Sequence, residues 1–368
     1  MKKDNYFKRL GYVKEDIPTK KFSNFEISEL PAQAIYTGID KFIEGNKGVF
    51  DYDTNQRQKN CGLGKAYTEE VQEKCNSGFY LKINQNNVAD EPVNISASFK
   101  LDEKNDVLYD QSFIEIAENT KAKLSVFLES DECSLKHNFF RSGLMRIKVK
   151  SNSELNLIKV QNLNKESRNF ETLKIDADKN AVINIYDIQL GAKVNGASTS
   201  TYIHEDDVEV NIFPLYFVNE QRRADFEQNF IINGKKTNAV ISATGVLKDK
   251  SKKMFRGNLF FNRGCSGSFA RFSDNTNMFD KGVVGMTIPT IFCDEDDVIG
   301  EHAASFSAID DDQLYYLMTR GFDELSAKIL MAKAAFLPIL NIIDDKAMRD
   351  KLIDELNINL NETIEAKI

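Results

Sequence analysis

The residues best suited to metal or thiol chemistry lie within Pro289–Gly321. Cys293 stands directly before the four acids Asp294–Asp297, and His302, one of only 3 histidines in the chain, follows shortly after. Thiolate and imidazole are ligands that iron and zinc accept readily. Cys293 and His302 are therefore the first candidate metal ligands, with Glu301 and Asp297 as weaker candidates. The alternative is an acidic loop in which Cys293 is a buried strand residue and His302 caps a turn.

The same segment resembles the C-terminal block of the SufB/SufD family of iron–sulfur cluster assembly proteins, and the SufD-like branch in particular. That block has a proline-containing strand, an acidic pair before valine, a histidine followed by small residues, and a helix that ends in Arg-Gly. The matching residues here are Pro289, Asp296-Asp297-Val298, His302-Ala303-Ala304, Ile309-Asp310, Leu314-Tyr315-Tyr316-Leu317 and Thr319-Arg320-Gly321. Weaker resemblance extends upstream through Gly245–Phe261 and back to about Cys61.

The resemblance implies a right-handed parallel β-helix core and a non-catalytic scaffold role in a SUF-type iron–sulfur cluster assembly system. It implies pairing with a SufB-like chain, or with a second copy of this chain, and docking of a SufC-like ATPase. In the family, a histidine at the position of His302 lies where subunits meet and is implicated in cluster assembly. We therefore expect Cys293 and His302 to line a transient iron or iron–sulfur site, with no permanently bound cofactor.

Two departures from the family pattern favour an accessory scaffold over a cluster-building subunit. Some relatives carry a histidine where Asn233 stands, and many carry Gln or Glu around Arg271–Phe272. Neither position offers a metal ligand in this chain.

Composition excludes several classes of protein. The hydrophobic content of 42% is enough for a core, and the net charge of −8 argues against a nucleic-acid partner. The run of about 18 apolar residues that a membrane helix needs is absent, as is the apolar segment of a secretory signal. The 5 cysteines are widely spaced and form no CxxC pair. This spacing indicates reduced thiols and predicts a cytoplasmic protein.

Strand-like segments recur at a near-constant spacing between Phe79 and Phe279. The three clearest copies are Asn152–Leu163, Asn180–Gly191 and Asp207–Val218, centred on Asn156, Asn184 and Asn211. The steps between these asparagines are 28 and 27 residues. A constant step in strand-like sequence indicates stacked coils, because one coil cannot bury its apolar face alone. A β-sandwich is the alternative. We predict a mainly β chain with the solenoid over residues 81–308.

Helical patterns flank the predicted solenoid. Residues 1–80 form a mixed region in which Ile35–Glu44 and Thr68–Asn76 have helical spacing. Residues 309–368 form a helical region, in which Asp310 and Asp323 are predicted N-caps. The expected ATPase-docking residues are Leu314, Tyr315, Leu317, Arg320, Phe322, Leu325 and Ile329. The alternative for this apolar face is that it covers the open end of the solenoid, and both uses can hold.

The sequence does not predict an enzyme. Gly62–Lys65 only faintly resembles a phosphate-binding loop, and the run Lys248–Lys253 is expected to be a solvated turn. A β-solenoid carbohydrate-active enzyme is an unfavoured alternative. Such an enzyme needs paired carboxylates along a groove, whereas the acids here gather in one loop.

Overall fold

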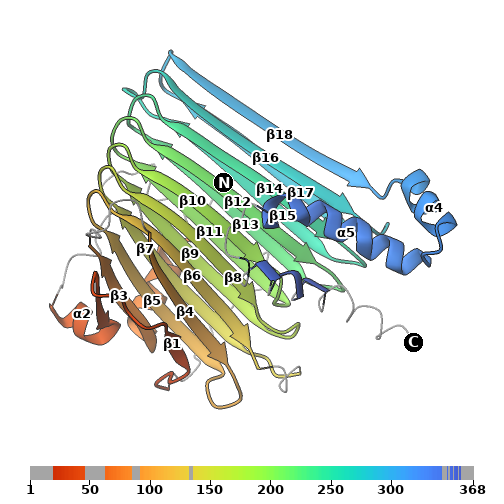
Figure 1. Cartoon of the computed structure of the whole chain (residues 1–368), viewed down its shortest axis with the longest axis horizontal. Helices are drawn as coiled ribbons and strands as arrows, with labels where there is room; N and C mark the ends of the chain where they lie inside the picture. Colours follow the sequence, from red (N-terminus) through yellow and green to blue (C-terminus); the bar gives the residue numbers. More distant parts are fainter. Residues whose placement is uncertain are drawn as a thin grey trace.

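The computed structural model describes residues 20–45, 63–84, 92–131 and 136–341, and beyond them positions 346, 349–350, 352–354 and 356–357. Two nine-stranded sheets lie face to face along the molecule (Figure 1). From β3 onward, successive strands alternate between the two sheets, so each coil contributes one strand to each. The result is a flattened β-solenoid, as the sequence predicts.

The element bounds follow this alternation. The first sheet contains β1 (Phe25–Ile27), β4 (Val93–Leu101), β6 (Lys121–Ser130), β8 (Glu154–Asn162), β10 (Val182–Gln189), β12 (Glu209–Val218), β14 (Asn238–Leu247), β16 (Ser268–Met278) and β18 (Val298–Ala308). The second sheet contains β2 (Ala34–Gly38), β3 (Ser77–Ile83), β5 (Val107–Ile116), β7 (Phe140–Val149), β9 (Arg168–Ala177), β11 (Val194–Ile203), β13 (Arg223–Ile232), β15 (Lys252–Phe261) and β17 (Val284–Cys293). The described helices are α2 (Ile39–Gly45), α3 (Lys65–Lys74), α4 (Asp311–Thr319) and α5 (Glu324–Leu340).

The repeat seen in the sequence is the coil of the solenoid. Asn184 pairs in parallel register with Asn156 on one side and Asn211 on the other. Their side-chain amides donate along the stack, with N–O distances of 3.0 and 3.1 Å. Among the described strand pairs, β1–β4 and β2–β3 are antiparallel and the others are parallel. The two sheets are thus built of stacked parallel coils, and the β-sandwich alternative is wrong.

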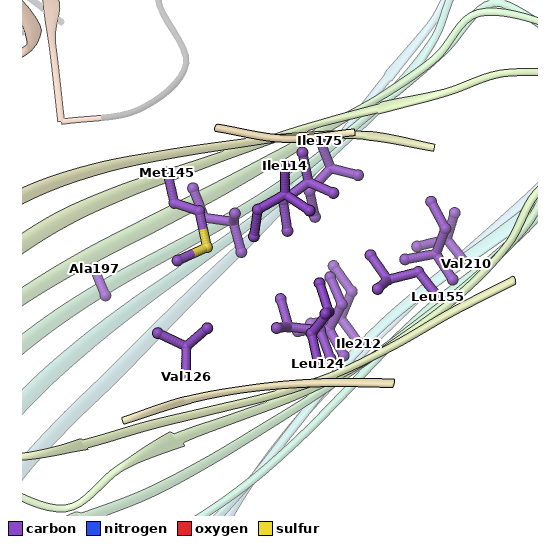
Figure 2. Close-up of a cluster of buried hydrophobic side chains, with 14 of the residues drawn as sticks. Ile114, Leu124, Val126, Met145, Leu155, Ile175, Ala197, Val210 and Ile212 are labelled. Carbon is purple, nitrogen blue, oxygen red and sulfur yellow. The ribbon is translucent and has the colours of Figure 1, made fainter. Parts of the chain in front are cut away.

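The main core fills the space between the two sheets. Alternate residues of each strand face the interior, because side chains on a strand alternate between its two faces. Figure 2 shows Ile114 and Met145 of the second sheet facing Leu124 and Ile212 of the first. Each such fully buried aliphatic side chain contributes about 1.5–3 kcal/mol, so apolar stacking dominates the stability of the coil.

Polar residues turn the chain at the corners between the sheets. Asn119, Asn152 and Asn180 have φ values of 55°, 57° and 55° and occupy equivalent corners of successive coils. Asparagine tolerates this left-handed conformation better than most residues. The need for this conformation at each corner explains why polar residues recur in the sequence at the same step as the strands.

The N-terminal region is less helical than predicted. Residues 35–38 belong to strand β2, which pairs antiparallel with β3, and the helix begins only at Ile39. Pairing with β3 satisfies backbone groups that would otherwise be left at the sheet edge, and this tertiary gain outweighs a weak local preference for helix. The helix predicted over Thr68–Asn76 does form, but its bounds are shifted, since α3 covers Lys65–Lys74.

Both C-terminal caps form as predicted. The Asp310 carboxylate accepts hydrogen bonds from the amides of Asp312 and Gln313, and Asp323 accepts from the amide of Ser326. Helix α5 packs on the outer face of the first sheet, and its contacts with the solenoid include β12 and β14 (Figure 1). The sequence left open that the C-terminal helices cover the open end of the solenoid. For α5 this alternative is wrong, because its apolar face packs on the side of the first sheet.

Candidate functional site

The last coil of the solenoid is open along one edge. β17 and β18 are the terminal strands of their sheets, and in the described chain each pairs on one side only, with β15 and β16 respectively. The outer face of β17 presents large apolar side chains that are 39–49% exposed: Val284, Met286, Ile288 and Phe292. An open, apolar strand edge can accept the strand of another chain.

Cys293 and His302 both lie in this last coil. Cys293 pairs in register with Phe261, and His302 pairs with Phe272, and both phenylalanines are core residues. The cysteine and the histidine therefore project from the inward faces of their strands. Both are nevertheless exposed, because no coil covers them in the described chain.

These positions rule out the structural alternatives for the two residues. Cys293 is not a buried strand cysteine, since it is exposed and its thiol donates to the carbonyl of Glu295 at 3.0 Å. His302 lies within strand β18 and caps no turn. A thiol and an imidazole are thus both presented at the open end.

Glu301 lies on the opposite face of strand β18 from His302, so it does not join the pair formed by Cys293 and His302. Its neighbours in sequence face the other side of β18, and its carboxylate binds the Arg271 guanidinium at 2.6 and 2.7 Å. Across the residues that the structure describes, no group of three or more His, Cys, Asp or Glu side chains could hold a metal ion. A complete coordination shell at Cys293 or His302 would therefore need donors from outside the described chain.

The residues expected to dock a partner divide between two environments. Tyr315 is 70% exposed and Phe322 is 43% exposed, while Arg320 lies over the Tyr316 ring at 5.0 Å. Leu314 and Leu317 are half-buried, and α4 has no fully buried residue. Ile329 packs against the cluster that joins α5 to the first sheet. Leu325 lies in α5, but its side chain is outside the described part.

Sequence reasoning missed a buried ionic network inside the solenoid. Arg141 binds Asp110 through two hydrogen bonds of 2.6 and 3.0 Å and also binds Glu171 at 2.6 Å. Lys159, in the other sheet, reaches across to Glu171 and also binds Asp187 of the adjacent strand β10 at 3.0 Å. Burial alone would raise the pKa of Glu171, but the charges of Lys159 and Arg141 outweigh it and lower that pKa to about 2. The available signal was that Lys159 shares the inward alternation of Leu155 and Leu157.

A second buried charge corrects the prediction for the lysine run. Lys253 is not in a solvated turn, because its side chain is fully buried and pairs with Asp274. Burial lowers the pKa of Lys253, against the opposing effect of Asp274. The Tyr216 hydroxyl donates to the same carboxylate at 2.7 Å, and the Phe306 ring lies 5.2 Å from the lysine nitrogen. The interior just below the open coil therefore contains a buried ion pair within its apolar core.

Comparison with known proteins identifies the family. The family model described as "SUF system FeS cluster assembly, SufBD core domain" matches residues 99–335, which includes most of the solenoid together with α4 and part of α5. This chain belongs to the SufB/SufD family. The family assembles iron–sulfur clusters, so the resemblance carried by the C-terminal block is confirmed.

Individual relatives agree with this assignment. An iron–sulfur cluster assembly SufBD family protein of Staphylococcus saprophyticus is 21% identical over 313 residues, which cover 82% of this chain and 66% of that protein. The SufD protein of Bacillus subtilis is 30% identical over 133 residues, or 36% of this chain and 30% of that one. A SufBD family protein of Mycobacterium tuberculosis is 24% identical over 204 residues, and the match spans only 24% of its length. No helix in the described residues has the length and apolar character to cross a membrane.

Proposed function

We propose that this chain is a non-catalytic, cytoplasmic scaffold subunit of a SUF-type iron–sulfur cluster assembly complex. It pairs through the open end of its solenoid with a SufB-like chain and docks a SufC-like ATPase through its C-terminal helices. The observation that carries this proposal is the open last coil, which presents Cys293 and His302 beside unpaired strand edges. A second copy of this chain is the alternative partner at the same edge.

Pairing would use the backbone of β17 and β18. A partner strand added to either edge satisfies the backbone groups left open there, and alternate side chains set the specificity. The apolar face of β17 would be removed from water in the same step. The partner would also bring donors to the inward face of the last coil, where this chain offers a thiol and an imidazole.

The cluster is cargo in this proposal and not a resident cofactor. Two donors hold an iron ion or a nascent cluster weakly, because iron–sulfur clusters are normally held by four ligands. Release then follows when the partner's donors move away. The buried pair Lys253–Asp274 and the core below it keep the inward faces of the last coil in a fixed position.

Docking of the ATPase would use the exposed side of α4. Tyr315, Arg320 and Phe322 are residue types that dominate binding energy at protein interfaces when a partner buries them. Helix α5 is anchored on the solenoid through Phe336 and Leu340, so a pull on this region would be transmitted to the outer face of the first sheet. Nucleotide-driven motion of the ATPase could then separate the paired scaffold subunits.

Co-expression with a SufC-like ATPase and a SufB-like chain from one source tests the proposal. We expect light scattering to give the mass of a complex containing all three chains. Tyr315→Ala combined with Phe322→Ala should remove the ATPase and leave the scaffold pair. Tyr36→Ala is a matched control, because Tyr36 is also an exposed aromatic residue and lies in β2 at the far end of the second sheet.

Substitution at the open end tests the pairing separately. Met286→Lys combined with Ile288→Lys places two charges on the face of β17 and should leave a monomer that still binds the ATPase. A stable scaffold pair in this variant, or a folded chain that forms no complex with either partner, would refute the proposal. A pair formed when this chain is expressed alone would favour the homodimer.

A further inference from the structure

A small void lies inside the solenoid, between the two sheets. It is bordered by β10 and β12 of the first sheet and by β11, β13 and β15 of the second. All of its lining residues are buried, and the space takes about one water-sized sphere. The lining residues include Asp187, Gln189, Tyr216, Phe226, Gln228 and Phe255. A ligand held in this void would be surrounded by protein.

Two residues at the void each carry an oxygen without a hydrogen-bond donor. Gln228 is 3% exposed, and its Oε1 has no partner among the described residues. Asp187 is 2% exposed, and the Gln189 amide donates to its Oδ1 at 2.7 Å. Lys159 lies 3.0 Å from the same oxygen, and no hydrogen bond from the described chain reaches Oδ2. Because buried acceptors normally have a partner, these oxygens point to a ligand in the void.

The ionic network beside the void has more negative than positive groups. Asp110, Glu171 and Asp187 contribute three carboxylates to it. Arg141 and Lys159 contribute two cations, so the ionised network has a net charge of one negative unit. Buried charges are normally neutralised by a counter-charge, because the interior screens them poorly. Asp187 is the member of this network that borders the void.

The neighbouring buried cations do not supply the missing charge. Arg222 donates to the Leu190 carbonyl at 2.9 Å. Lys253 pairs with Asp274. Within the described residues, neither cation forms an ion pair or hydrogen bond with Asp187. One positive charge is therefore still needed beside the void.

We propose that the void binds a small monovalent cation, such as sodium, potassium or ammonium, through the Asp187 carboxylate and the Gln228 carbonyl oxygen. Carboxylate and carbonyl oxygens suit hard cations. A single charge equals the deficit of the network, whereas a divalent ion would reverse its sign. A water molecule would satisfy the oxygens but would leave the negative charge. Phe226 and Phe255 also border the void, and aromatic rings attract cations through their faces.

The ion would join the two sheets in the middle of the solenoid. Asp187 belongs to β10 of the first sheet, and Gln228 belongs to β13 of the second. A ligand bound only by the folded state stabilises that state in proportion to the logarithm of its concentration. The expected effect is therefore on the stability of the chain alone, and it does not depend on the proposed scaffold function.

The unfolding midpoint of the purified full chain in different salts tests the proposal. Urea titrations are made in sodium, potassium, ammonium and choline chloride at one ionic strength. Choline is the reference, because it is too large for a void of this size. We expect the midpoint to rise when at least one of the three small cations replaces choline, and to rise further with its concentration.

Thallium(I) tests the position of the ion directly. This monovalent cation takes the place of sodium or potassium in oxygen-lined sites, and it scatters X-rays anomalously. Crystals of the full chain soaked in thallium(I) acetate should show an anomalous peak between Asp187 and Gln228. Equal midpoints in all four salts, together with no peak at this place, would overturn the proposal. The network would then be neutralised by a proton on Asp187.

Variants connect the salt effect to the void. Asp187→Asn should abolish the cation-dependent rise of the midpoint, and Gln228→Leu should weaken the apparent affinity by about fivefold or more. Asp225→Asn is the matched control, because Asp225 is also buried but pairs with Arg256 and does not border the void. Its midpoint should still respond to the cation. If Asp187→Asn does not fold, the salt series and the thallium peak of the wild-type chain decide. None of these results bears on formation of the scaffold complex.

Discussion

At the scale of single residues, buried charges distinguish this solenoid from a purely apolar one. Glu171 is held by Arg141 and Lys159 inside the core, whereas Glu301 binds Arg271 on the surface, where both side chains are about half exposed. A carboxylate should therefore contribute far more to the free energy of unfolding in the buried network than in the surface pair. Removing one partner of a buried pair leaves the other charge without compensation, whereas a surface pair is screened by water.

Glu171→Gln should lower the free energy of unfolding by about 1–3 kcal/mol, because Arg141 and Lys159 lose charge-assisted hydrogen bonds to a shared carboxylate. Arg141 keeps Asp110 and Lys159 keeps Asp187, so neither buried cation is left without a counter-charge. Glu301→Gln is the matched control and should change the free energy of unfolding by at most about 1 kcal/mol. Urea unfolding followed by circular dichroism measures both. Equal effects in the two variants would show that the interior network is not a major source of stability.

His302→Ala tests the histidine of the open coil. We expect the rate of cluster formation in the reconstituted complex to fall by about tenfold or more, as expected when a metal site loses a ligand or its support. The unfolding midpoint should not change, because His302 is exposed. His137→Ala is the control, since His137 is a half-buried histidine that contacts Asp106 in another part of the solenoid. Normal cluster formation by His302→Ala would remove this residue from the site.

At the scale of elements, α4 depends on its cap more than on packing. None of its residues is fully buried, and the Asp310 carboxylate accepts from the amides of Asp312 and Gln313 at 3.0 and 3.1 Å. A helix of this length is marginal without tertiary contacts, so the cap contributes a large part of its local stability. This matters for function because α4 carries Leu314, Tyr315 and Leu317 of the proposed ATPase-docking residues.

Asp310→Ala should therefore open α4 without unfolding the solenoid. Loss of an N-cap lowers the stability of a helix by about 0.5–2 kcal/mol. We therefore expect faster hydrogen exchange of the α4 amides, while exchange in β14 and β16 stays slow. Asp311→Ala is the control, because Asp311 lies in the first turn and offers only a favourable charge there. Unchanged exchange in α4 would mean that other contacts hold the helix.

At the scale of the whole molecule, the interior network links stability to pH. The folded-state pKa of Glu171 is lowered from 4.5 to about 2. Its stabilisation is therefore present above the unfolded-state pKa and is lost as pH falls toward 2. Asp187 has the opposite effect, because burial raises its pKa and outweighs the nearby Lys159.

Comparison of two proteins isolates the contribution of Glu171. The free energy of unfolding should fall between pH 5 and pH 2 more steeply in the wild-type chain than in Glu171→Gln, which lacks the titrating group. Denaturant titrations at a series of pH values measure both slopes. Parallel curves would show that Glu171 has the same pKa in the folded and unfolded states.

The sequence by itself determined the solenoid, the period of its coils and the capped C-terminal helices. These features depend on local patterns: the alternation of apolar residues in Asn180–Gly191, the steps between Asn156, Asn184 and Asn211, and the spacing of Asp310 from Gln313. Each pattern is contained in one coil or one helix turn, and the repetition of the coil makes its long-range partners predictable. The block around His302 likewise carried the family assignment.

Only the tertiary structure decided which side chains meet across the interior and which strand remains open. Asp110, Arg141 and Glu171 are separated by 31 and 30 residues, so no local pattern shows that their charges meet. Lys253 was predicted to be solvated, but it is buried against Asp274 of strand β16. Residues 35–38 were predicted to be helical, but they form a strand because they pair with β3. Burial and pairing depend on residues supplied by other coils, and no local pattern contains that information.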